Sequence, residues 1–532
     1  MTAPHHHPTS SKSKQATWLA ALALTLLGLL QFLPHLSTVD FHHEEGRRVI
    51  PALEMLKTGD WIVPTIWGEP YLSKPPGIFW LMAASMRAFG ELSTFAPRLV
   101  SVLASLATML GLLWAGKRIF GLRAGILGAL FFLVCKETLD KSRLAEIEAS
   151  LACAVFFSTT CWWFGRRGSI GWSVASGIFL GVAILLKGPA ALIFFAGGPL
   201  ALAWKERSLR PLFSARLLIP LSIGVCLPTC WMFALFAIFD SGAAGDTWSG
   251  QIGGQGGRTL AIYAAERGHF FLGSVLACFP ASFVLLFSLG TEEGKQLVRE
   301  DSTLFALATV AAGWLFFMIF PGTSVRYFYP ALPLVALAAG SALDRASSKV
   351  FLARLNGLAL FFCGLGALVF VTAVVGFFVD LGDLRIDATG LGIAGLVLLI
   401  AIAAWRQTGF RRQALALIVI PLAIEVLLTN QLTPGKAERQ SRAPYARKID
   451  AALVEGEVLN VCFWSDFNTM LYVDHEIELA GSWEEVPSGE AALVNAAQWT
   501  HMTSEGADAQ AFTLLLEVKV RRSHLRLIRV HE

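Results

Sequence analysis

Long apolar runs constrain this chain of 532 residues more than any other feature. A helix needs about 20 apolar residues to cross the hydrocarbon of a bilayer. Runs of roughly that length lie at about 16–33, 97–116, 122–136, 146–165, 171–187, 189–204, 215–239, 269–290, 303–320, 327–343, 355–379, 388–405 and 412–429. The chain is 55% hydrophobic and 15% charged, which excludes a soluble multidomain protein. We therefore predict an α-helical polytopic membrane protein with about thirteen transmembrane helices.

The basic residues predict how the chain is oriented in its membrane. Loops on the cytoplasmic side of membrane proteins are enriched in Lys and Arg. With the N-terminus in the cytoplasm, the inside loops hold Lys12/Lys14, Lys117/Arg118/Arg123, Arg166/Arg167, Lys205/Arg207/Arg210/Arg216, Lys295/Arg299, Arg345/Lys349/Arg354 and Arg406/Arg411/Arg412. An odd number of spans then places the C-terminal segment outside, in the periplasm of a bacterial inner membrane. The net charge of +4 falls in these short clusters and does not indicate nucleic-acid binding.

Composition predicts three parts. Residues 1–15 read as a disordered cytoplasmic tail, 16–430 as the transmembrane domain with its first outer loop at 37–96, and 431–532 as a small periplasmic α/β domain. In the last part we predict a helix at Pro444–Val454 and five strands, at Val458–Trp464, Thr469–Val473, Ala491–Val494, Phe512–Val520 and Leu525–Val530.

The stretch from Glu44 to Pro76 is too polar to cross a bilayer, and it follows the first segment that can. Its Trp and Tyr rings favour the headgroup level of a membrane. The segments Glu44–Leu56 and Ile78–Phe89 are predicted to be two helices lying along the outer surface, where they cap a cavity between the spanning helices.

Acidic residues at the outer ends of helices are the candidates for chemistry, because an ionised carboxylate near hydrocarbon is costly. Glu44 and Glu45 open the first surface helix, and Glu146 and Glu148 lie near the outer end of a spanning run. The alternative is that they are interfacial carboxylates, solvated by headgroup water and paired with Arg47 or Arg143. The pattern does not separate the two interpretations.

Several motifs carry a resemblance to a known family. In the first outer loop they are Glu44-Glu45-Gly46-Arg47-Arg48, Glu54-Met55-Leu56, Gly59-Asp60-Trp61 and Tyr71-Leu72-Ser73-Lys74-Pro75-Pro76. Arg143-Leu144-Ala145-Glu146-Ile147-Glu148, Lys187-Gly188-Pro189 and the run from Ser324 to Pro333 follow in order. This series resembles the bacterial branch of the protein mannosyltransferase-like glycosyltransferases, which includes the aminoarabinose transferase that modifies lipid A.

The resemblance implies the GT-C fold, with about thirteen helices and a periplasmic C-terminal domain. It also implies transfer of a sugar from a polyprenyl-phosphate donor to a lipid A-like or other envelope acceptor. Glu44 and Glu148 stand where the family usually has Asp. Ser73 stands where close relatives have a Glu that can hold a metal ion, so a divalent metal is not indicated here.

Such a transfer needs a base to take the acceptor's hydroxyl proton and cations to balance the charge on the departing phosphate. Glu44 or Glu148 is the candidate base. The candidates for substrate binding are Lys74, Arg258, Arg326, Tyr327, Tyr329, Glu45 and Arg47. The glycine-rich run 250–257 has the flexibility of a lid.

Two other classes compete with this hypothesis. A lipid or glycolipid transporter or flippase would also have many helices and charges within the membrane, but its polar sites usually lie near the bilayer midplane. A scaffold that binds periplasmic partners through its C-terminal domain would leave the first outer loop unexplained.

Overall fold

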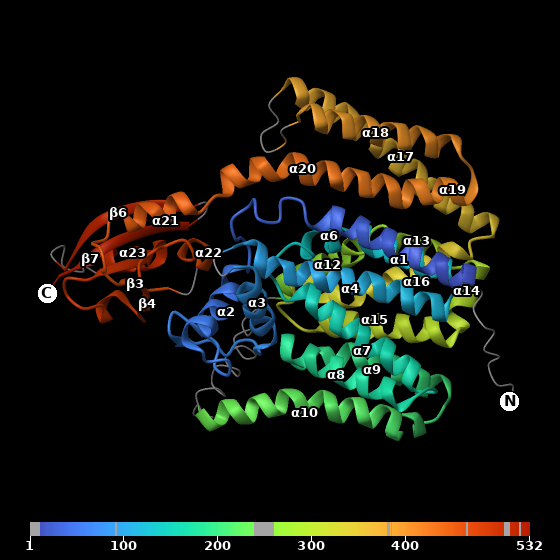
Figure 1. The fold of residues 1–532 in the computed structure, drawn as a ribbon, viewed down its shortest axis with the longest axis horizontal. Coiled ribbons are helices and arrows are strands. Elements are labelled where there is room, and N and C mark those ends of the chain that lie inside the picture. Colours follow the sequence, from blue (N-terminus) through green and yellow to red (C-terminus); the bar gives the residue numbers. More distant parts are fainter. Residues whose placement is uncertain are drawn as a thin grey trace. The chain divides into compact units, whose positions relative to one another are not determined.

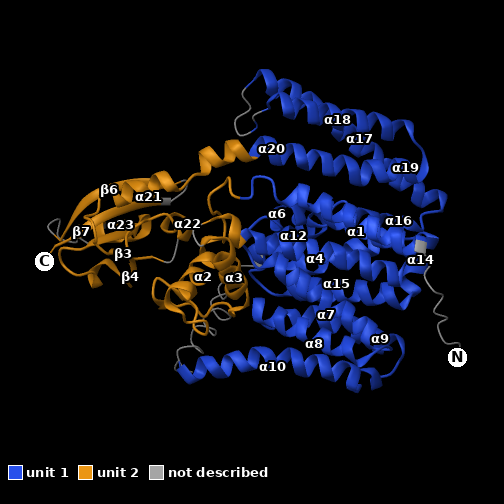
Figure 2. Ribbon diagram, in the orientation of Figure 1, with its two compact units in different colours: residues 1–36, 98–432 blue, residues 37–97, 433–532 orange. Residues whose placement is uncertain are grey.

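The structure is a computed structural model that describes residues 11–90, 93–238, 260–379, 384, 386–463, 466–504, 511–520 and 523–531 (Figure 1). The chain divides into two compact units (Figure 2). Unit 1 comprises residues 1–36 and 98–432, and unit 2 comprises 37–97 and 433–532. The first outer loop therefore belongs to the same unit as the C-terminal segment, although more than 330 residues separate them in the sequence.

Unit 1 is helical throughout its described part. Its helices before the glycine-rich run are α1 (Ser11–Phe32), α4 (Phe95–Ile119), α5 (Leu122–Val134), α6 (Lys136–Lys141), α7 (Glu148–Gly165), α8 (Ile170–Lys187), α9 (Ala190–Lys205), η1 (Arg210–Phe213) and α10 (Ala215–Ile238). After that run come α12 (Leu260–Ala277), α13 (Ala281–Ser288), α14 (Glu292–Arg299), α15 (Asp301–Ile319), η2 (Val325–Ala331), α16 (Leu332–Asp344), α17 (Lys349–Phe378), α18 (Ala388–Arg406), α19 (Gly409–Ala414), η3 (Leu415–Val419) and α20 (Ile420–Gln440). The boundary between the units falls within α20.

Among the described residues, eight helices are long and apolar enough to cross a membrane, or nine if one bent pair counts as a single span. Shorter apolar helices are α5, α9 and α3 (Gly77–Phe89). An α-helical protein with several membrane spans is thus confirmed. The total of thirteen stays a prediction, because several of the predicted runs form helices that are shorter or less apolar than a full span requires.

Glycine allows the central helices of unit 1 to pack closely. A Cβ added at Gly125 of α5 would lie 2.8 Å from the carbonyl oxygen of Leu113 in α4, and one at Gly340 of α16 would lie 2.4 Å from the backbone nitrogen of Gly128. In a membrane the hydrophobic effect does not drive helices together, and small residues at helix contacts allow the close backbone packing that does. These two glycines therefore hold α4, α5 and α16 together.

Two predicted runs are not simple helices. The run 269–290 is broken, because α12 and α13 meet at an angle of 98° on either side of a break that contains Pro280. A proline has no N–H for the helical ladder and clashes with the preceding turn. The run 327–343 begins as the 3₁₀ helix η2, and α16 starts only at Leu332.

The predicted tail 1–15 lies outside the described residues up to position 10, and α1 begins at Ser11. The predicted glycine-rich lid at 250–257 also lies outside them.

In unit 2, the first outer loop forms α2 (Gly46–Thr58), the short strands β1 (Thr65–Ile66) and β2 (Glu69–Pro70), and α3. The two predicted helices are found as α2 and α3, whereas their place along the outer surface stays a prediction. The β1–β2 hairpin between them was not predicted. Its turn residues Trp67 and Gly68 have φ angles of 53° and 80°, which suits a tight turn of the I′ type. The Glu54 carboxylate of α2 accepts hydrogen bonds from the backbone N–H groups of both turn residues.

The C-terminal part of unit 2 packs helices around a five-stranded sheet of order β4-β3-β5-β7-β6. Its elements are α21 (Ala443–Asp450), β3 (Leu459–Val461), α22 (Phe467–Met470), β4 (Ile477–Leu479), η4 (Trp483–Glu485), β5 (Ala491–Asn495), α23 (Ala496–Ser504), β6 (Phe512–Val520) and β7 (Ser523–Val530). Strand β3 pairs in parallel with β4 and β5, whereas β5, β7 and β6 pair antiparallel. Apolar side chains of α21 and the strands, such as Ile449 and Leu493, form the core between them.

One predicted strand of this domain is wrong. Thr469–Val473 is rich in apolar residues and has a β-branched residue at each end, but it starts inside the helix α22 and continues as a turn. The reason lies just before it, where Asp466 has a φ of 56° and its carboxylate is bound by Arg442, which also donates a hydrogen bond of 3.0 Å to Thr469 Oγ1. These contacts start a helical turn and leave β4, which was not predicted, as the edge strand.

Candidate active site

The candidate residues fall in both units, and each group is described within its own unit. Arg258 lies outside the described residues.

In unit 1 the central contact is an ion pair between Glu148 and Lys187. Glu148 is the first residue of α7 and Lys187 the last of α8, so the side-by-side packing of these helices brings the two charges together. Lys187 Nζ lies 2.9 Å from Glu148 Oε1, and the two side chains are 13% and 6% exposed. A pair this close and this buried fixes both side chains, because separating the charges would leave each without compensation.

Aromatic and basic residues of η2 complete this group. The ammonium of Lys187 lies 4.4 Å from the ring centroid of Tyr327, and the guanidinium of Arg326 lies 5.8 Å from the same ring. Arg326 also interacts electrostatically with Glu148. The predicted site residues Glu148, Arg326 and Tyr327 are therefore neighbours, and we call them, together with Lys187, the unit 1 cluster. Tyr329 is different, because it is only 1% exposed and lies in the core.

A second buried ion pair lies beside this cluster. Lys141 Nζ is 2.7 Å from Glu146 Oε2, and Lys141 also interacts with Glu148. Burial alone would lower the pKa of Lys141, but the carboxylates of Glu146 and Glu148 hold that pKa above its usual value. Lys141 therefore stays charged at any physiological pH.

These contacts correct the expected partners of the carboxylates. Arg143, the predicted partner, instead donates to the hydroxyl of Thr429 at 3.1 Å and to the backbone carbonyl of Pro34. Glu146 instead pairs with Lys141 of α6, and Glu148 pairs with Lys187 of α8.

In unit 2 the candidate residues surround the start of α2. Glu44 is 32% exposed, and its Oε2 lies 3.3 Å from Nη2 of Arg48 one helical turn later. Arg48, and not Arg47, is therefore its partner in this unit. Arg48 also donates a hydrogen bond of 2.7 Å to the hydroxyl of Tyr71. The guanidinium of Arg47 lies over the Tyr71 ring at 5.3 Å, so one tyrosine holds both arginines.

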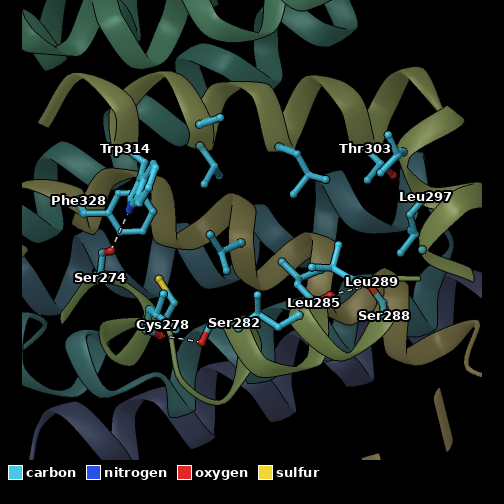
Figure 3. Close-up of a pocket in the computed structure, with 18 residues that line it drawn as sticks. Ser274, Cys278, Ser282, Leu285, Ser288, Leu289, Leu297, Thr303, Trp314 and Phe328 are labelled. Atoms are coloured by element: carbon cyan, nitrogen blue, oxygen red, sulfur yellow. Dashed lines mark hydrogen bonds between the residues drawn. The ribbon is translucent and has the colours of Figure 1, made fainter. Parts of the chain in front are cut away.

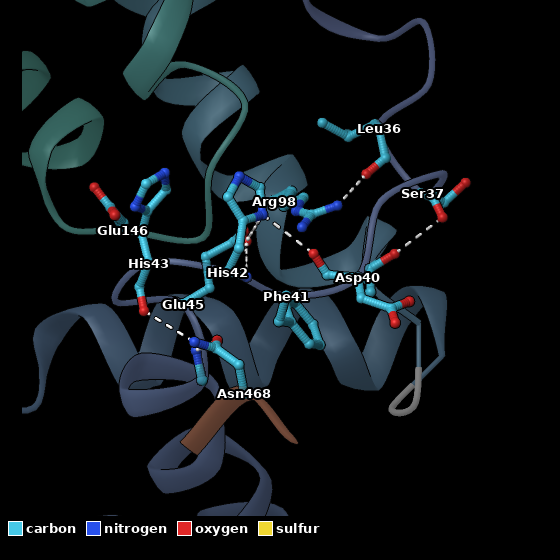
Figure 4. A network of polar contacts seen from close by, with 12 residues as sticks. Leu36, Ser37, Asp40, Phe41, His42, His43, Glu45, Arg98, Glu146 and Asn468 are labelled. Carbon is cyan, nitrogen blue, oxygen red and sulfur yellow. Dashed lines mark hydrogen bonds and ion pairs between the residues drawn. The ribbon is translucent and has the colours of Figure 1, made fainter. Parts of the chain in front are cut away.

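Glu45 is fully buried, and it accepts a hydrogen bond of 2.9 Å from the backbone N–H of His42 (Figure 4). It therefore shapes the turn before α2, and its role in substrate binding stays a prediction. Lys74 is half-buried in the turn before α3, and its ammonium donates to the backbone carbonyl of Ser73 at 2.9 Å.

Among the described residues there is no group of three or more His, Cys, Asp and Glu side chains placed to hold an ion. Ser73 offers only a neutral hydroxyl, which is a weaker ligand for a hard cation than a carboxylate.

An apolar cavity of about 300 Å³ opens among α12, α13, α14, α15 and α16 (Figure 3). Trp314 and Phe328 lie at one end, and Thr303 and Leu297 at the other. The Trp314 indole donates a hydrogen bond of 3.0 Å to Ser274, so this polar group is already satisfied. Phe328, which lines this cavity, is the residue after Tyr327 in η2, so one helical turn contributes to both the cavity and the unit 1 cluster.

Sequence reasoning missed Lys187, Lys141, Arg48 and Tyr71 as members of the two groups. The spacing of Arg48 four residues after Glu44 on a helix was a usable signal. The Lys-Gly-Pro motif marked Lys187, but nothing local to it indicates that its partner comes from another helix.

Comparisons with known proteins agree with the motifs. The profile of the family described as Dolichyl-phosphate-mannose-protein mannosyltransferase matches residues 73–236. An undecaprenyl phosphate-alpha-4-amino-4-deoxy-L-arabinose arabinosyl transferase of Pseudomonas savastanoi pv. phaseolicola is 27% identical, over 66% of this chain and 67% of its own length. One from Edwardsiella ictaluri is 25% identical over 68% of this chain and 66% of its own. These matches therefore span about two thirds of each relative.

The fold agrees over a longer stretch. The crystal structure of ArnT from Cupriavidus metallidurans bound to undecaprenyl phosphate matches 98% of both chains, with a TM-score of 0.69 and 17% sequence identity. The apo structure of the same protein gives the same TM-score. These comparisons confirm the resemblance predicted from the motifs, and they identify the chain as a glycosyltransferase, similar in sequence to the aminoarabinose transferases and similar to them in fold.

Proposed function

We propose that this chain transfers a sugar from a polyprenyl-phosphate donor to a lipid A-like or other envelope acceptor at the periplasmic face of a bacterial inner membrane. Support for the donor comes from relatives whose names include undecaprenyl phosphate and from the lipid bound to the Cupriavidus protein. The orientation with a cytoplasmic N-terminus, the thirteen spans and the periplasmic C-terminal domain are part of the same proposal. A transporter is not favoured, because the relatives are transferases.

The observation that carries the proposal is the unit 1 cluster. Lys187 and Arg326 bring two positive charges beside one tyrosine ring, next to the buried carboxylate of Glu148. A departing polyprenyl phosphate gains negative charge as its bond to the sugar breaks, and fixed cations stabilise that charge. We assign this role to Lys187 and Arg326, with Lys74 and Arg258 as further candidates for the donor phosphate.

The two candidate carboxylates differ in their exposure and in the length of their ion pairs. Glu148 is buried against an ammonium at 2.9 Å, and this contact serves to hold Lys187. Glu44 is about one-third exposed and its contact to Arg48 is longer, at 3.3 Å. We therefore assign Glu44 as the base. It takes the proton of the acceptor hydroxyl, whose oxygen bonds to the anomeric carbon while the bond from that carbon to the phosphate oxygen breaks and polyprenyl phosphate leaves.

The base is tested with purified protein in nanodiscs. Glu44→Gln keeps size and hydrogen bonding but cannot accept the proton, so turnover should fall by roughly 10²–10⁴-fold while donor binding persists. Glu44→Asp should keep part of the activity, limited by its shorter reach. Glu69→Gln, which changes an exposed carboxylate in the β1–β2 hairpin of the same loop, is the matched control and should leave turnover unchanged. Wild-type turnover by Glu44→Gln would exclude Glu44 as the base.

The acceptor is tested in cells. Mass spectrometry of lipid A and other envelope glycans is compared between cells with and without the protein. We expect a sugar-bearing species that depends on the protein and disappears with Glu44→Gln. Identical envelope lipids and glycans in both strains would contradict the proposed function.

A further inference from the structure

Within unit 2, one side chain of the C-terminal domain forms two hydrogen bonds to the backbone of the segment that carries the proposed base. Asn468 lies in α22, and its side chain is 7% exposed. Its Oδ1 accepts a hydrogen bond of 2.8 Å from the backbone N–H of Gly46, and its Nδ2 donates one of 3.0 Å to the backbone carbonyl of His43 (Figure 4). The two residues between these anchors are Glu44 and Glu45.

Both hydrogen bonds are specific to an amide. The carbonyl oxygen can only face the N–H of Gly46 and the NH₂ group can only face the oxygen of His43, so the contacts fix which end of the amide is which. An aspartate would keep the first bond but set an anionic oxygen against the His43 carbonyl. An alanine would leave both backbone groups without this partner.

The backbone held in this way is not one that the chain adopts readily. His43 has a φ of 54°, in the left-handed region that a residue with a Cβ disfavours. Gly46 has no room for a side chain, because a Cβ there would lie 2.8 Å from the backbone carbonyl carbon of Phe467 and 2.9 Å from Asn468 Oδ1. Both ends of the Glu44–Glu45 segment are thus set by contact with α22.

Helix α22 is itself anchored. Arg442 binds the carboxylate of Asp466 just before the helix and Thr469 within it. The backbone N–H of Arg442 donates in turn to the Asp40 carboxylate at 2.6 Å, so the segment before α2 is tied to the C-terminal domain a second time.

We propose that Asn468 is a positioning residue for sugar transfer, which holds the backbone of residues 43–46 so that Glu44 points to its reaction partner. The inference rests on the proposed function, because it takes Glu44 as the base. It gives the C-terminal domain a part in the reaction without any contact to substrate.

The test compares Asn468→Ala with Asn495→Ala in the full-length protein. Asn495 caps α23 in the same domain by accepting hydrogen bonds from two backbone N–H groups, so its loss is a matched structural defect away from α2. Turnover per folded molecule should fall roughly 10- to 100-fold in Asn468→Ala, because a small misplacement of a reacting group has effects of this size. The KM for donor should change little, and Asn495→Ala should keep wild-type kcat. Equal kcat for the two alanine variants would overturn the inference.

The pH dependence of turnover in Asn468→Asp distinguishes a positioning role from a purely structural one. The ionised carboxylate repels the His43 carbonyl, whereas the protonated acid can donate to it as the amide does. Turnover of Asn468→Asp relative to wild type should therefore rise as pH falls through the pKa of the introduced acid, which burial raises above its ordinary value. A ratio that is constant with pH, in a variant that is folded throughout, would count against the positioning role.

Glu44→Gln separates the two proposals. If Glu44→Gln loses turnover while Asn468→Ala keeps it, the positioning role alone is wrong. If Glu44→Gln keeps turnover, the proposed base is wrong and the inference is overturned with it, since no base would remain for Asn468 to position.

Discussion

At the residue scale, Glu148 and Lys187 form a buried ion pair in which each charge stabilises the other. Removing one partner of a buried pair leaves the other uncompensated, and the loss is typically about 3–5 kcal/mol. Lys187→Met should therefore destabilise the protein by about that amount in chemical unfolding in detergent. The double variant Glu148→Gln, Lys187→Met should recover most of the stability but none of the transfer activity.

The exposed pair Lys136–Asp140 is the matched control for this cycle. Its atoms are 2.8 Å apart, but its side chains are 65% and 56% exposed, so Lys136→Met should lose less than about 1 kcal/mol. A double variant at Glu148 and Lys187 that is as unstable as Lys187→Met alone would show that the pair is not the source of the effect.

Lys74 is expected to bind the donor phosphate. Lys74 is a half-buried residue of the first outer loop, and charge-assisted hydrogen bonds are worth about 1.5–3 kcal/mol, so Lys74→Ala should weaken donor binding roughly 10- to 100-fold. Binding is measured with the purified protein and a polyprenyl phosphate. Lys57→Ala changes an exposed lysine of α2 in the same loop and should have no effect. Unchanged binding in Lys74→Ala would mean that its ammonium serves only to reach headgroups.

Sequence motifs mix residues for structure with residues for chemistry. In the first outer loop Glu54 binds the hairpin, Gly59 ends α2 with a φ of 75°, and the Asp60 carboxylate accepts from the N–H groups of Ile62 and Val63. These residues made the resemblance specific, yet they build the turn. Only Glu44 and Lys74 of that series are left as candidates for the reaction. The motifs predicted which loop carries the site. They could not tell the catalytic candidates from the residues that build turns, because a Glu or an Asp can serve either purpose.

At the element scale, hydropathy predicted most helices of unit 1 within a few residues, because burial in lipid or protein acts on the whole length of a run. It could not predict breaks, since these depend on one or two residues. The run 269–290 is apolar at both ends, but α12 and α13 bend by 98° around Pro280. The pattern at 469–473 failed for a related reason, because the Arg442–Asp466 contact that starts α22 involves a residue 24 positions away.

The cavity beside the bent pair is expected to hold part of the hydrocarbon of the lipid donor. Val335 of α16 lines it, and Val335→Phe should fill part of its volume of about 300 Å³. The KM for a long-chain donor should rise several-fold while a short-chain donor is affected less, because only the long chain needs the space. Val371→Phe on the exposed face of α17 is the control. Equal KM values for both donors in Val335→Phe would remove the cavity from the lipid path.

At the scale of the whole molecule, the orientation in the membrane is expected to place unit 2 in the periplasm. Glu69→Cys and Glu455→Cys introduce thiols at exposed positions of its two chain segments, and Thr408→Cys introduces one in a loop expected to be cytoplasmic. The exposed Cys226 and Cys230 are first replaced by Ser. An impermeant reagent that crosses only the outer membrane should label the first two sites in intact cells and the third only in opened cells. The reverse pattern would invert the topology.

The sequence predicted a first outer loop and a C-terminal domain as separate parts, and the structure joins them in one unit. Nothing in residues 37–97 indicates a partner at 433–532, because the contacts between the two segments join residues hundreds of positions apart. The bond between Gly46 and Asn468 spans 422 positions. Pattern analysis uses windows of ten to twenty residues, so it cannot detect such a pair.

That span has a consequence for biosynthesis. The segment around Glu44 is made early, but Asn468 is translated 422 residues later. At 5–20 residues per second this delay is on the order of 20–80 s. In the proposed orientation the first outer loop has by then crossed the membrane without the contacts that shape it, so the nascent chain should be inactive and accessible to periplasmic proteases. Maturation of the proposed active site is in this way made conditional on translation past Asn468, and a product truncated before that residue should be cleared without ever consuming donor lipid.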